Sequence, residues 1–160
     1  MHYGTPGGPW KVIDEWPDGS IEKQLTNGSC GSACGAAMLR EIGVSIAQAK
    51  LLQILGDWPN TWEQSRVMNE IAGAEVFTND RIYGDRVNQI ERMSANCPFG
   101  AVLVDRVSLL TEHPTIHMVL VDGLNSLGQV IVRDPNQATR YGLDLAEFAT
   151  YFSGQAVWVK

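Results

Sequence analysis

The stretch that decides the fold is Gln24-Leu-Thr-Asn-Gly-Ser-Cys30-Gly-Ser-Ala-Cys-Gly-Ala-Ala-Met38. Asn27-Gly28-Ser29 is a turn and helix-start signal, and small and apolar residues then recur at helical spacing until Gly43. The sequence therefore predicts that Cys30 lies at or near the N-terminus of a helix. The pKa of a free thiol, about 8.5, falls at such a position. Cys30 is therefore a candidate nucleophile.

The elements around this helix follow from periodicity and turn residues. Further helices are predicted over Ser45–Leu55 (Ile46, Ala49, Leu52 and Leu55 inward), Thr61–Ala72 (Thr61 and Gln64 as a capping box), Asp85–Ser94 and Leu143–Phe152. Strands are predicted over Gly100–Asp105, Ile116–Val121, Gln129–Arg133 and Ala156–Lys160, and an N-terminal hairpin pairs Lys11–Glu15 with Ile21–Gln24. Helices followed by an antiparallel sheet predict an α+β domain.

Length and composition predict one domain. The chain has 160 residues, of which 44% are hydrophobic and 19% charged, and it contains no apolar run long enough to cross a bilayer. The first residues lack the features of a signal peptide. We expect residues 1–20 to be an extended lead-in or the stub of a longer protein, and residues 21–160 to form a single catalytic domain.

Charge and cysteine content narrow the function. Lys and Arg total 12 against 18 Asp and Glu, a net charge of -6, which makes nucleic acid a less favoured partner, although a local basic patch stays possible. Three cysteines do not make the disulfide framework of a small secreted protein. At least one thiol is therefore free.

A register calculation brings two polar residues together. If Gly123 and Gly128 mark the symmetric ends of a hairpin loop, paired residues have numbers that sum to 251, and His117 lies opposite Asp134. Opposed residues have Cβ atoms roughly 4.5–5.5 Å apart, within reach of a carboxylate–imidazole hydrogen bond. Slipping the strands by one residue would separate the two residues onto opposite faces.

These residues suit thiol chemistry on a carbonyl. Cys30 would attack as a thiolate, His117 would act as general base and later as acid, and Asp134 would orient the imidazole. The oxyanion needs donors, for which the candidates are the backbone N–H of Cys30 and the side-chain amide of Gln24. This chemistry needs neither a cofactor nor a metal.

Each residue also has an ordinary structural interpretation, since a free Cys is usually a small buried hydrophobe. A metal site formed by Cys30, Cys34 and His117 is an alternative, but no fourth ligand suggests itself. Other residues are expected to be structural or to have no evident partner: Cys97, His113, and the tryptophans Trp58, Trp62 and Trp158, which are predicted to lie in the core.

The sequence resembles papain-like cysteine peptidases, above all the bacteriocin-leader peptidase domains of ABC exporters. The resemblance rests on Gln24 through Met38, His117-Met-Val-Leu-Val-Asp-Gly123, Val132-Arg-Asp134-Pro135 and the closing Tyr141–Val157 segment. It implies the same roles for Cys30, His117, Asp134 and Gln24. Ser29 stands where leader peptidases usually carry an acidic residue, and no transporter follows.

A second resemblance is to papain-fold toxin domains of bacterial polymorphic and contact-dependent inhibition toxins. It implies delivery to the cytoplasm of a target bacterium and a cognate immunity protein. We therefore predict a papain-like α+β domain that hydrolyses peptide bonds, as a bacterial toxin module acting on a protein or peptide, with no membrane partner.

Three alternatives stay open: a glutamine deamidase or transglutaminase-like toxin, a papain-fold RNase, and a non-enzymatic binding module. The RNase would need its cations to gather at the cleft, the candidates being Lys11, Lys23, Arg81, Arg86, Arg106, Arg133 and Arg140. Loops around Pro59, Asn79-Asp80 and His113-Pro114 are expected to form the walls of the cleft.

Overall fold

The computed structural model describes residues 2–3, 7–81, 85–93, 97–105 and 116–160. An antiparallel sheet of eight strands runs in the order β1-β2-β7-β6-β5-β4-β8-β3. The strands are β1 (His2–Tyr3), β2 (Lys11–Pro17), β3 (Phe77–Arg81), β4 (Phe99–Val104), β5 (Ile116–Leu124), β6 (Gln129–Asp134), β7 (Thr139–Asp144) and β8 (Phe152–Val159). The helices are α1 (Cys30–Glu41), α2 (Gln48–Leu55), α3 (Thr61–Ala72), α4 (Arg86–Met93) and α5 (Leu145–Tyr151).

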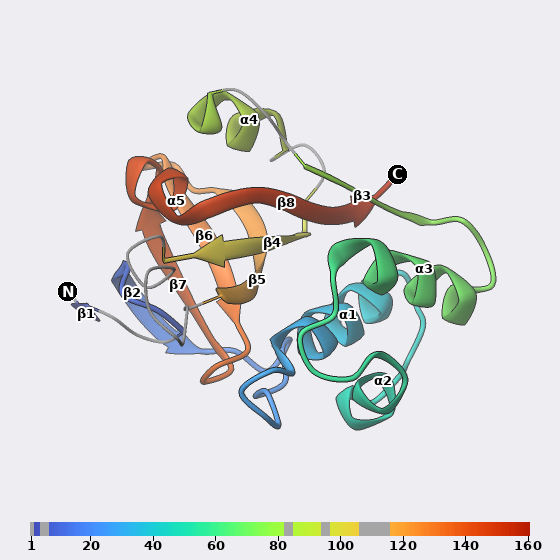
Figure 1. The fold of residues 1–160 in the computed structure, drawn as a ribbon. Coiled ribbons are helices and arrows are strands. Elements are labelled where there is room, and N and C mark those ends of the chain that lie inside the picture. Colours follow the sequence, from blue (N-terminus) through green and yellow to red (C-terminus); the bar gives the residue numbers. More distant parts are fainter. Residues whose placement is uncertain (1, 4–6, 82–84, 94–96, 106–115) are drawn as a thin grey trace.

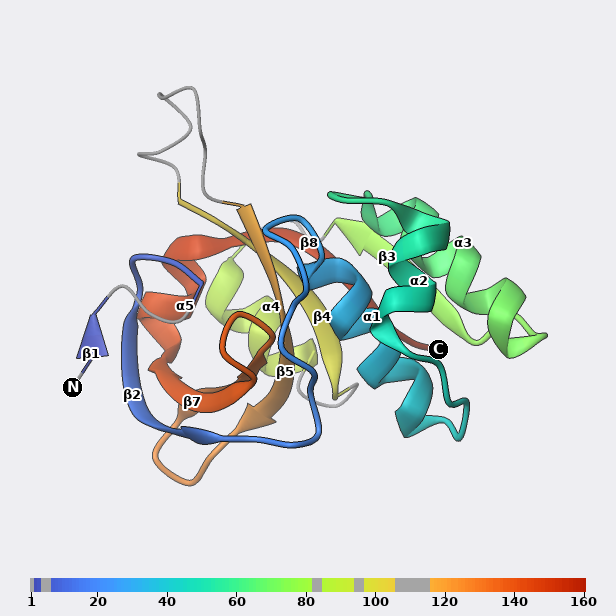
Figure 2. The same ribbon diagram turned by 90° about the horizontal axis from the view of Figure 1, so that it is seen from below.

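The helices divide between two hydrophobic cores. Figures 1 and 2 show α1, α2 and α3 gathered on one side of the molecule, with α5 and the curved part of the sheet on the other. Strand β5 contributes to both cores: Met118 and Leu120 pack with the α1–α3 group, and Val119 and Val121 pack with the residues near α5. This alternation follows from the twofold side-chain period of a strand. The α+β prediction is confirmed.

Helix α1 begins at Cys30, as predicted, and α3 has the predicted bounds. Helix α2 begins later than expected, and its buried residues are Gln48, Leu51 and Leu55. The predicted inward face is confirmed at Leu55 and at Ile46, which packs partly buried against the core before the helix, and was wrong at Ala49 and Leu52. The predicted capping box of α3 was also wrong. The cap is Asn60, whose side-chain oxygen accepts a hydrogen bond of 2.7 Å from the backbone N–H of Glu63.

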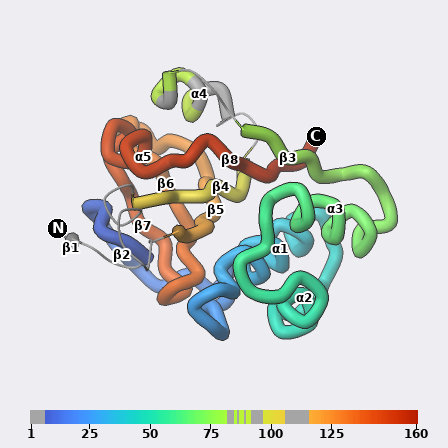
Figure 3. Tube along the Cα trace, viewed as in Figure 1, coloured from blue at the N-terminus to red at the C-terminus, as the bar shows by residue number. Residues whose placement is uncertain are grey.

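The N-terminal segment pairs differently from the prediction. Strand β2 forms as expected, but residues 21–24 are not a strand, and β2 pairs instead with β7, a strand the sequence did not predict. Figure 3 shows the blue β2 beside the orange β7, although they are far apart along the chain. Trp10, just before β2, is fully buried. Residues 10–17, expected to belong to a lead-in, therefore contribute to the core and the sheet.

The hairpin of β5 and β6 has a different register from the predicted one. Val121 pairs with Val132, and Leu120 pairs with Arg133. The register shifts at Asp122, and on the hairpin side of this irregularity Gly123 pairs with Ile131. The predicted pairing of His117 with Asp134 was therefore wrong by two residues. Because an even shift keeps both side chains on one face, they become diagonal neighbours, still within reach of each other.

An ion-pair network surrounds this irregularity. The Asp122 carboxylate accepts from Arg133 Nη2 at 2.9 Å and lies 3.2 Å from Arg140 Nη2. Arg133, whose side chain is 3% exposed, also lies 3.2 Å from Glu41, the last residue of α1. The network thus ties the β5–β6–β7 ladder to the C-terminal end of α1.

We expect Arg133→Leu to lower the free energy of unfolding by about 2 kcal/mol, because the half-buried Asp122 carboxylate loses a charged hydrogen bond and keeps Arg140 as its ion-pair partner. The control is Arg66→Leu, whose 2.7 Å pair with Glu70 is exposed on α3, and it should cost less than about 1 kcal/mol. Urea unfolding measures both. Equal costs would show that the network does not stabilise the fold.

Candidate active site

Three of the predicted residues meet although they come from different elements. Cys30 is the first residue of α1, His117 lies on β5, and Asp134 ends β6. His117 Nε2 lies 2.6 Å from Asp134 Oδ1, and His117 also interacts with the Cys30 sulfur. Cys30 and His117 are each 5% exposed and Asp134 is fully buried. Since Nε2 bonds to Asp134, Nδ1 is the ring nitrogen left for the thiol.

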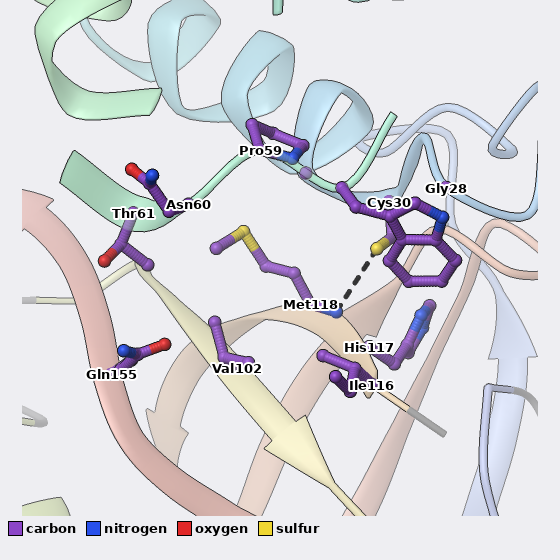
Figure 4. Close-up of a pocket in the computed structure, with 12 residues that line it drawn as sticks. Gly28, Cys30, Pro59, Asn60, Thr61, Val102, Ile116, His117, Met118 and Gln155 are labelled. Atoms are coloured by element: carbon purple, nitrogen blue, oxygen red, sulfur yellow. Dashed lines mark hydrogen bonds between the residues drawn. The ribbon is translucent and has the colours of Figure 1, made fainter. Parts of the chain in front are cut away.

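Helix α1 places Cys30 by docking on one edge of β5. Within the described residues, β6 pairs with β5 only from Leu120 toward the hairpin. The backbone of Met118 therefore lies beyond the β5–β6 ladder, although Met118 pairs with Val102 of β4 on the other edge of β5. The Met118 N–H donates to Cys30 Sγ at 3.4 Å, and Cys34 Sγ donates to the Met118 carbonyl at 3.5 Å. Figure 4 shows the first of these contacts. Two sulfurs one helical turn apart thus attach α1 to the strand.

Asp134 is held by several donors. Besides His117, its Oδ1 accepts from the backbone N–H of Asn136 at 2.9 Å, and its Oδ2 accepts from the Tyr141 hydroxyl at 2.5 Å. Because a buried carboxylate is costly without such partners, these bonds favour a single orientation facing His117.

The electrostatics favour a thiolate–imidazolium pair. Burial raises the pKa of Cys30, but hydrogen bonding to His117 and the charge of that ring outweigh it, so the pKa lies below the ordinary 9.0. Burial lowers the pKa of His117, but the Asp134 carboxylate raises it from 6.5 to about 10. The ion pair therefore forms as pH rises through the lowered pKa of Cys30 and persists until His117 deprotonates near 10.

A cavity of about 220 Å³ opens beside the sulfur. Figure 4 shows Cys30 and His117 on one side of it and Asn60, Thr61 and Gln155 on the other. Its lining comprises Gly28, Cys30, Gly31, Trp58, Pro59, Asn60, Thr61, Val102, Ile116, His117, Met118 and Gln155. The expected wall at Pro59 is thus present, Asn79 and Asp80 lie in β3 away from this lining, and His113-Pro114 lies outside the described residues.

The loop before α3 forms the rim of the cavity, and its geometry is unusual. Trp58 has φ +55°, a left-handed conformation that is rare for a bulky residue. Its N–H donates to the Gly28 carbonyl at 3.0 Å, and a Cβ on Gly28 would lie 2.8 Å from the indole nitrogen. The side chains of Trp58 and Trp62 are 55% and 63% exposed, so the prediction that they lie in the core was wrong. Trp158 packs partly buried against the core.

Gln24 lies on the loop that leads to α1. Its backbone N–H donates to the Pro135 carbonyl at 2.6 Å, next to Asp134. Its side-chain Nε2 donates to the Thr26 carbonyl at 3.0 Å and faces that of Asn27 at 3.5 Å. Gln24 is not among the residues that line the cavity. Its role in the oxyanion hole stays a prediction.

Sequence reasoning missed Trp10 and Tyr141. Trp10 stacks on His117 with ring centroids 6.2 Å apart and donates from Nε1 to the Tyr141 hydroxyl at 2.9 Å. Their signals were an aromatic residue within a Gly/Pro-rich stretch and a Tyr seven residues after Asp134. Neither signal specifies a partner without knowledge of the β2–β7 pairing.

The cation cluster that the RNase alternative would need does not line the described cavity, whose lining holds neither Lys nor Arg. Arg133 and Arg140 are engaged by acidic side chains, Arg106 lies outside the described residues, and the Arg86 side chain is not described. These positions give the RNase alternative no support. Within the described residues no three His, Cys, Asp or Glu side chains form a metal-binding group, and none of the helices could span a bilayer.

Comparison with solved structures places this fold in a class. The peptidase domain of Streptococcus ComA, a bi-functional ABC transporter involved in a quorum-sensing pathway, superposes with a TM-score of 0.64 at 18% identity, covering 87% of this chain and 96% of that one. A double-glycine-motif protease from an AMS/PCAT transporter, solved with its leader peptide, gives 0.64 at 14% identity, covering 93% and 91%. The fold is that of papain-like peptidase domains.

The family follows from the sequence comparison. The model of the Peptidase_C39 like family matches residues 18–158, so the chain belongs to this family. "Cysteine protease effector 1" of Escherichia coli O1:K1:H7 is 29% identical over 155 residues. That match covers 97% of this chain and 30% of the relative, so the chain spans under a third of the relative's length.

We expect His117→Ala to slow alkylation of Cys30 by iodoacetamide at pH 7 by at least about tenfold, because each unit of thiol pKa changes the thiolate fraction tenfold. Without His117, burial raises the pKa of the Cys30 thiol and is opposed by the backbone N–H groups of Met118 and Gly31. Peptide mapping distinguishes Cys30 from Cys97, whose pKa burial raises to about 12. An unchanged rate would show that the imidazole does not activate the thiol.

Cys34→Ala tests the metal alternative. We expect the pH profile of Cys30 alkylation to stay unchanged and stability to fall by about 1 kcal/mol, since the variant loses one hydrogen bond to the Met118 carbonyl. Metal content is measured on the same samples. Loss of bound metal together with loss of Cys30 reactivity would contradict our assignment and favour a Cys30–Cys34–His117 metal site.

Proposed function

We propose that this protein hydrolyses peptide bonds with Cys30 as nucleophile, His117 as acid and base, and Asp134 as the residue that orients His117. The observation that supports this proposal most strongly is the position of the Cys30 thiol. It lies at the start of α1, beside the buried His117–Asp134 pair, in the wall of an open cavity. A purely structural cysteine would need none of these contacts.

The first step forms an acyl-enzyme. The Cys30 thiolate attacks the carbonyl carbon, a C–S bond forms, and the carbonyl electrons move to the oxygen. When the tetrahedral intermediate collapses, the C–N bond breaks and the His117 imidazolium gives its Nδ1 proton to the departing amine. His117 is then neutral and still held by Asp134.

The second step restores the enzyme. Neutral His117 takes a proton from water, whose oxygen attacks the thioester carbonyl, and the C–S bond breaks to release a carboxylic acid and the Cys30 thiolate. Both steps develop negative charge on the carbonyl oxygen. The first N–H groups of α1 lack intrahelical partners, so the backbone N–H of Cys30 is a suitable donor, with Gln24 as the second candidate.

The substrate we propose is an extended polypeptide segment. The cavity combines apolar walls at Pro59, Val102 and Met118 with polar groups at Asn60, Thr61 and Gln155. Trp58 and Ile116 are exposed at its edge and offer apolar surface to neighbouring residues of a peptide. The double-glycine-motif protease of the same fold was solved with a peptide bound, which supports this class of substrate.

We also propose that the chain is the toxic module of a bacterial competition system, delivered to the cytoplasm of a target cell and neutralised there by a cognate immunity protein. Support comes from the Escherichia coli relative named as a cysteine protease effector. An immunity protein that covers the mouth of the cavity would block access of substrate to Cys30 without changing the fold.

Growth after induced expression in a bacterial host tests this function. We expect the wild type to arrest growth and Cys30→Ala and His117→Ala to be harmless at equal protein levels, because each variant removes a group that reacts. New protein N-termini in the arrested cells would identify peptide hydrolysis, whereas glutamine-to-glutamate changes without cleavage would identify a deamidase. The matched control, Ser126→Ala, alters an exposed residue of the loop between β5 and β6, outside the cavity lining.

Arrest by all the variants alike would contradict the proposed thiol chemistry. Cleaved tRNA in place of new N-termini would contradict peptide hydrolysis and favour the RNase alternative. Growth unaffected by wild-type protein at the same level would contradict the toxin setting.

A further inference from the structure

The N-terminal segment crosses over the His117–Asp134 pair. Gly7 has φ +91°, and a Cβ built on it would lie 2.4 Å from His117 Cδ2, 2.5 Å from Nε2 and 2.9 Å from Asp134 Oδ2. Real Cβ atoms do not approach side chains this closely. The backbone at Gly7 therefore lies against the hydrogen bond between His117 and Asp134, on the side of the ring away from the Nδ1 that serves the thiol.

Trp10 continues this cover three residues later. Its ring is fully buried and lies 19° from parallel to the His117 ring. A Cβ on Gly8 would collide with the Trp10 ring at 2.1 Å, so the chain at residue 8 folds closely onto the indole. Gly7, Gly8 and Trp10 together form a strap, our name for residues 7–10, over the pair.

The strap also reaches the carboxylate through a relay of hydrogen bonds. Trp10 Nε1 donates to the Tyr141 hydroxyl at 2.9 Å, and that hydroxyl donates to Asp134 Oδ2 at 2.5 Å. A hydroxyl has one proton, and an indole N–H can only donate. By accepting from Trp10, Tyr141 therefore directs its own proton at Asp134.

We propose that Gly7, Trp10 and Tyr141 are positioning residues of the active site, which hold Asp134 toward His117 and keep water from their hydrogen bond. This inference rests on the proposed function of Cys30, His117 and Asp134. The inference gives the N-terminal segment a role in the active site. Trp10 and Tyr141 act on the same His117–Asp134 pair, although they are far apart in the sequence.

The relay acts through the charge on Asp134. Burial and the Asp134 carboxylate raise the pKa of Tyr141 well above 10, so the hydroxyl keeps its proton wherever the thiolate–imidazolium pair exists. The charge of Glu15 on β2 also raises the pKa of Tyr141, and the Asp134 charge also raises the pKa of Cys34 on α1. Without the Tyr141 donor, the Asp134 carboxylate is held less firmly toward His117, and it supports the imidazolium less.

The test measures Cys30 alkylation by iodoacetamide across pH, which needs no substrate. The acid limb of this profile is the pH range in which the alkylation rate rises as Cys30 ionises. For Tyr141→Phe, which keeps the ring, we expect the acid limb to move to higher pH by about one unit. Trp10→Phe keeps an aromatic ring against His117 but removes the N–H, and it should move the limb in the same direction by less. Phe148→Leu alters another fully buried aromatic of the same core and should lower the melting temperature without moving the limb.

Gly7→Ala tests the strap itself. We expect its Cβ to displace the pair and lower the alkylation rate at pH 6 by about tenfold, the change that one pH unit brings. The control is Gly19→Ala, since a Cβ there meets nothing within 4 Å, and its rate should match the wild type.

The outcomes separate this inference from the function on which it rests. A wild-type acid limb at an ordinary thiol pKa would overturn the proposed function itself. A wild-type limb below the pKa of an ordinary thiol that Tyr141→Phe and Trp10→Phe leave in place would overturn only the positioning role, even if both variants melt earlier. An unchanged rate for Gly7→Ala would show that the strap does not constrain the pair.

Discussion

The hydrogen bond between His117 and Asp134 is the interaction on which the rest of this structure depends. It joins two groups that are 5% and 0% exposed, and burying their charges would be costly without further compensation. Several elements supply that compensation: Tyr141 from β7 and the Asn136 amide beyond β6 donate to the carboxylate, and Trp10 before β2 covers the ring. The sheet order brings these groups together, because β2, β7, β6 and β5 are consecutive neighbours and each carries or adjoins one of them.

A single extra residue on β5 makes this bond possible. Near the hairpin, Gly123 pairs with Ile131, and continuing that register along regular strands would put His117 and Asp134 on opposite faces of the sheet. The bulge at Asp122 shifts the register by one residue, so that Val121 pairs with Val132. This shift brings Asp134 onto the same face of the sheet as His117. Asp122 is itself held by Arg133 and Arg140. The ion-pair network thus fixes the bulge, and the bulge fixes the face on which Asp134 lies.

Local signals predicted the parts of the site that lie close in sequence. The turn before Cys30 and the small residues after it predicted α1 from its first residue, and β-branched runs predicted β4, β5, β6 and β8. The predicted contact of His117 with Asp134 was right although the register was wrong, since an error of two residues preserves the face. Sequence could not predict the pairing of β2 with β7, because it joins the two ends of the chain and leaves no local pattern. Trp10 and Tyr141 were missed for that reason, and with them the cover over the pair.

Two cysteines one turn apart show how far position controls chemistry in this fold. Both sulfurs contact the backbone of Met118, but Cys30 accepts from its N–H while Cys34 donates to its carbonyl. Cys30 meets His117 at the start of the helix, and its pKa is lowered. Cys34 lies one turn deeper, where burial and the negative charges of Cys30 and Asp134 raise its pKa well above 9.0, so it remains a thiol. The protonated Cys34 can therefore donate to the Met118 carbonyl and stabilise the packing of α1 on β5, while the ionised Cys30 lies beside His117.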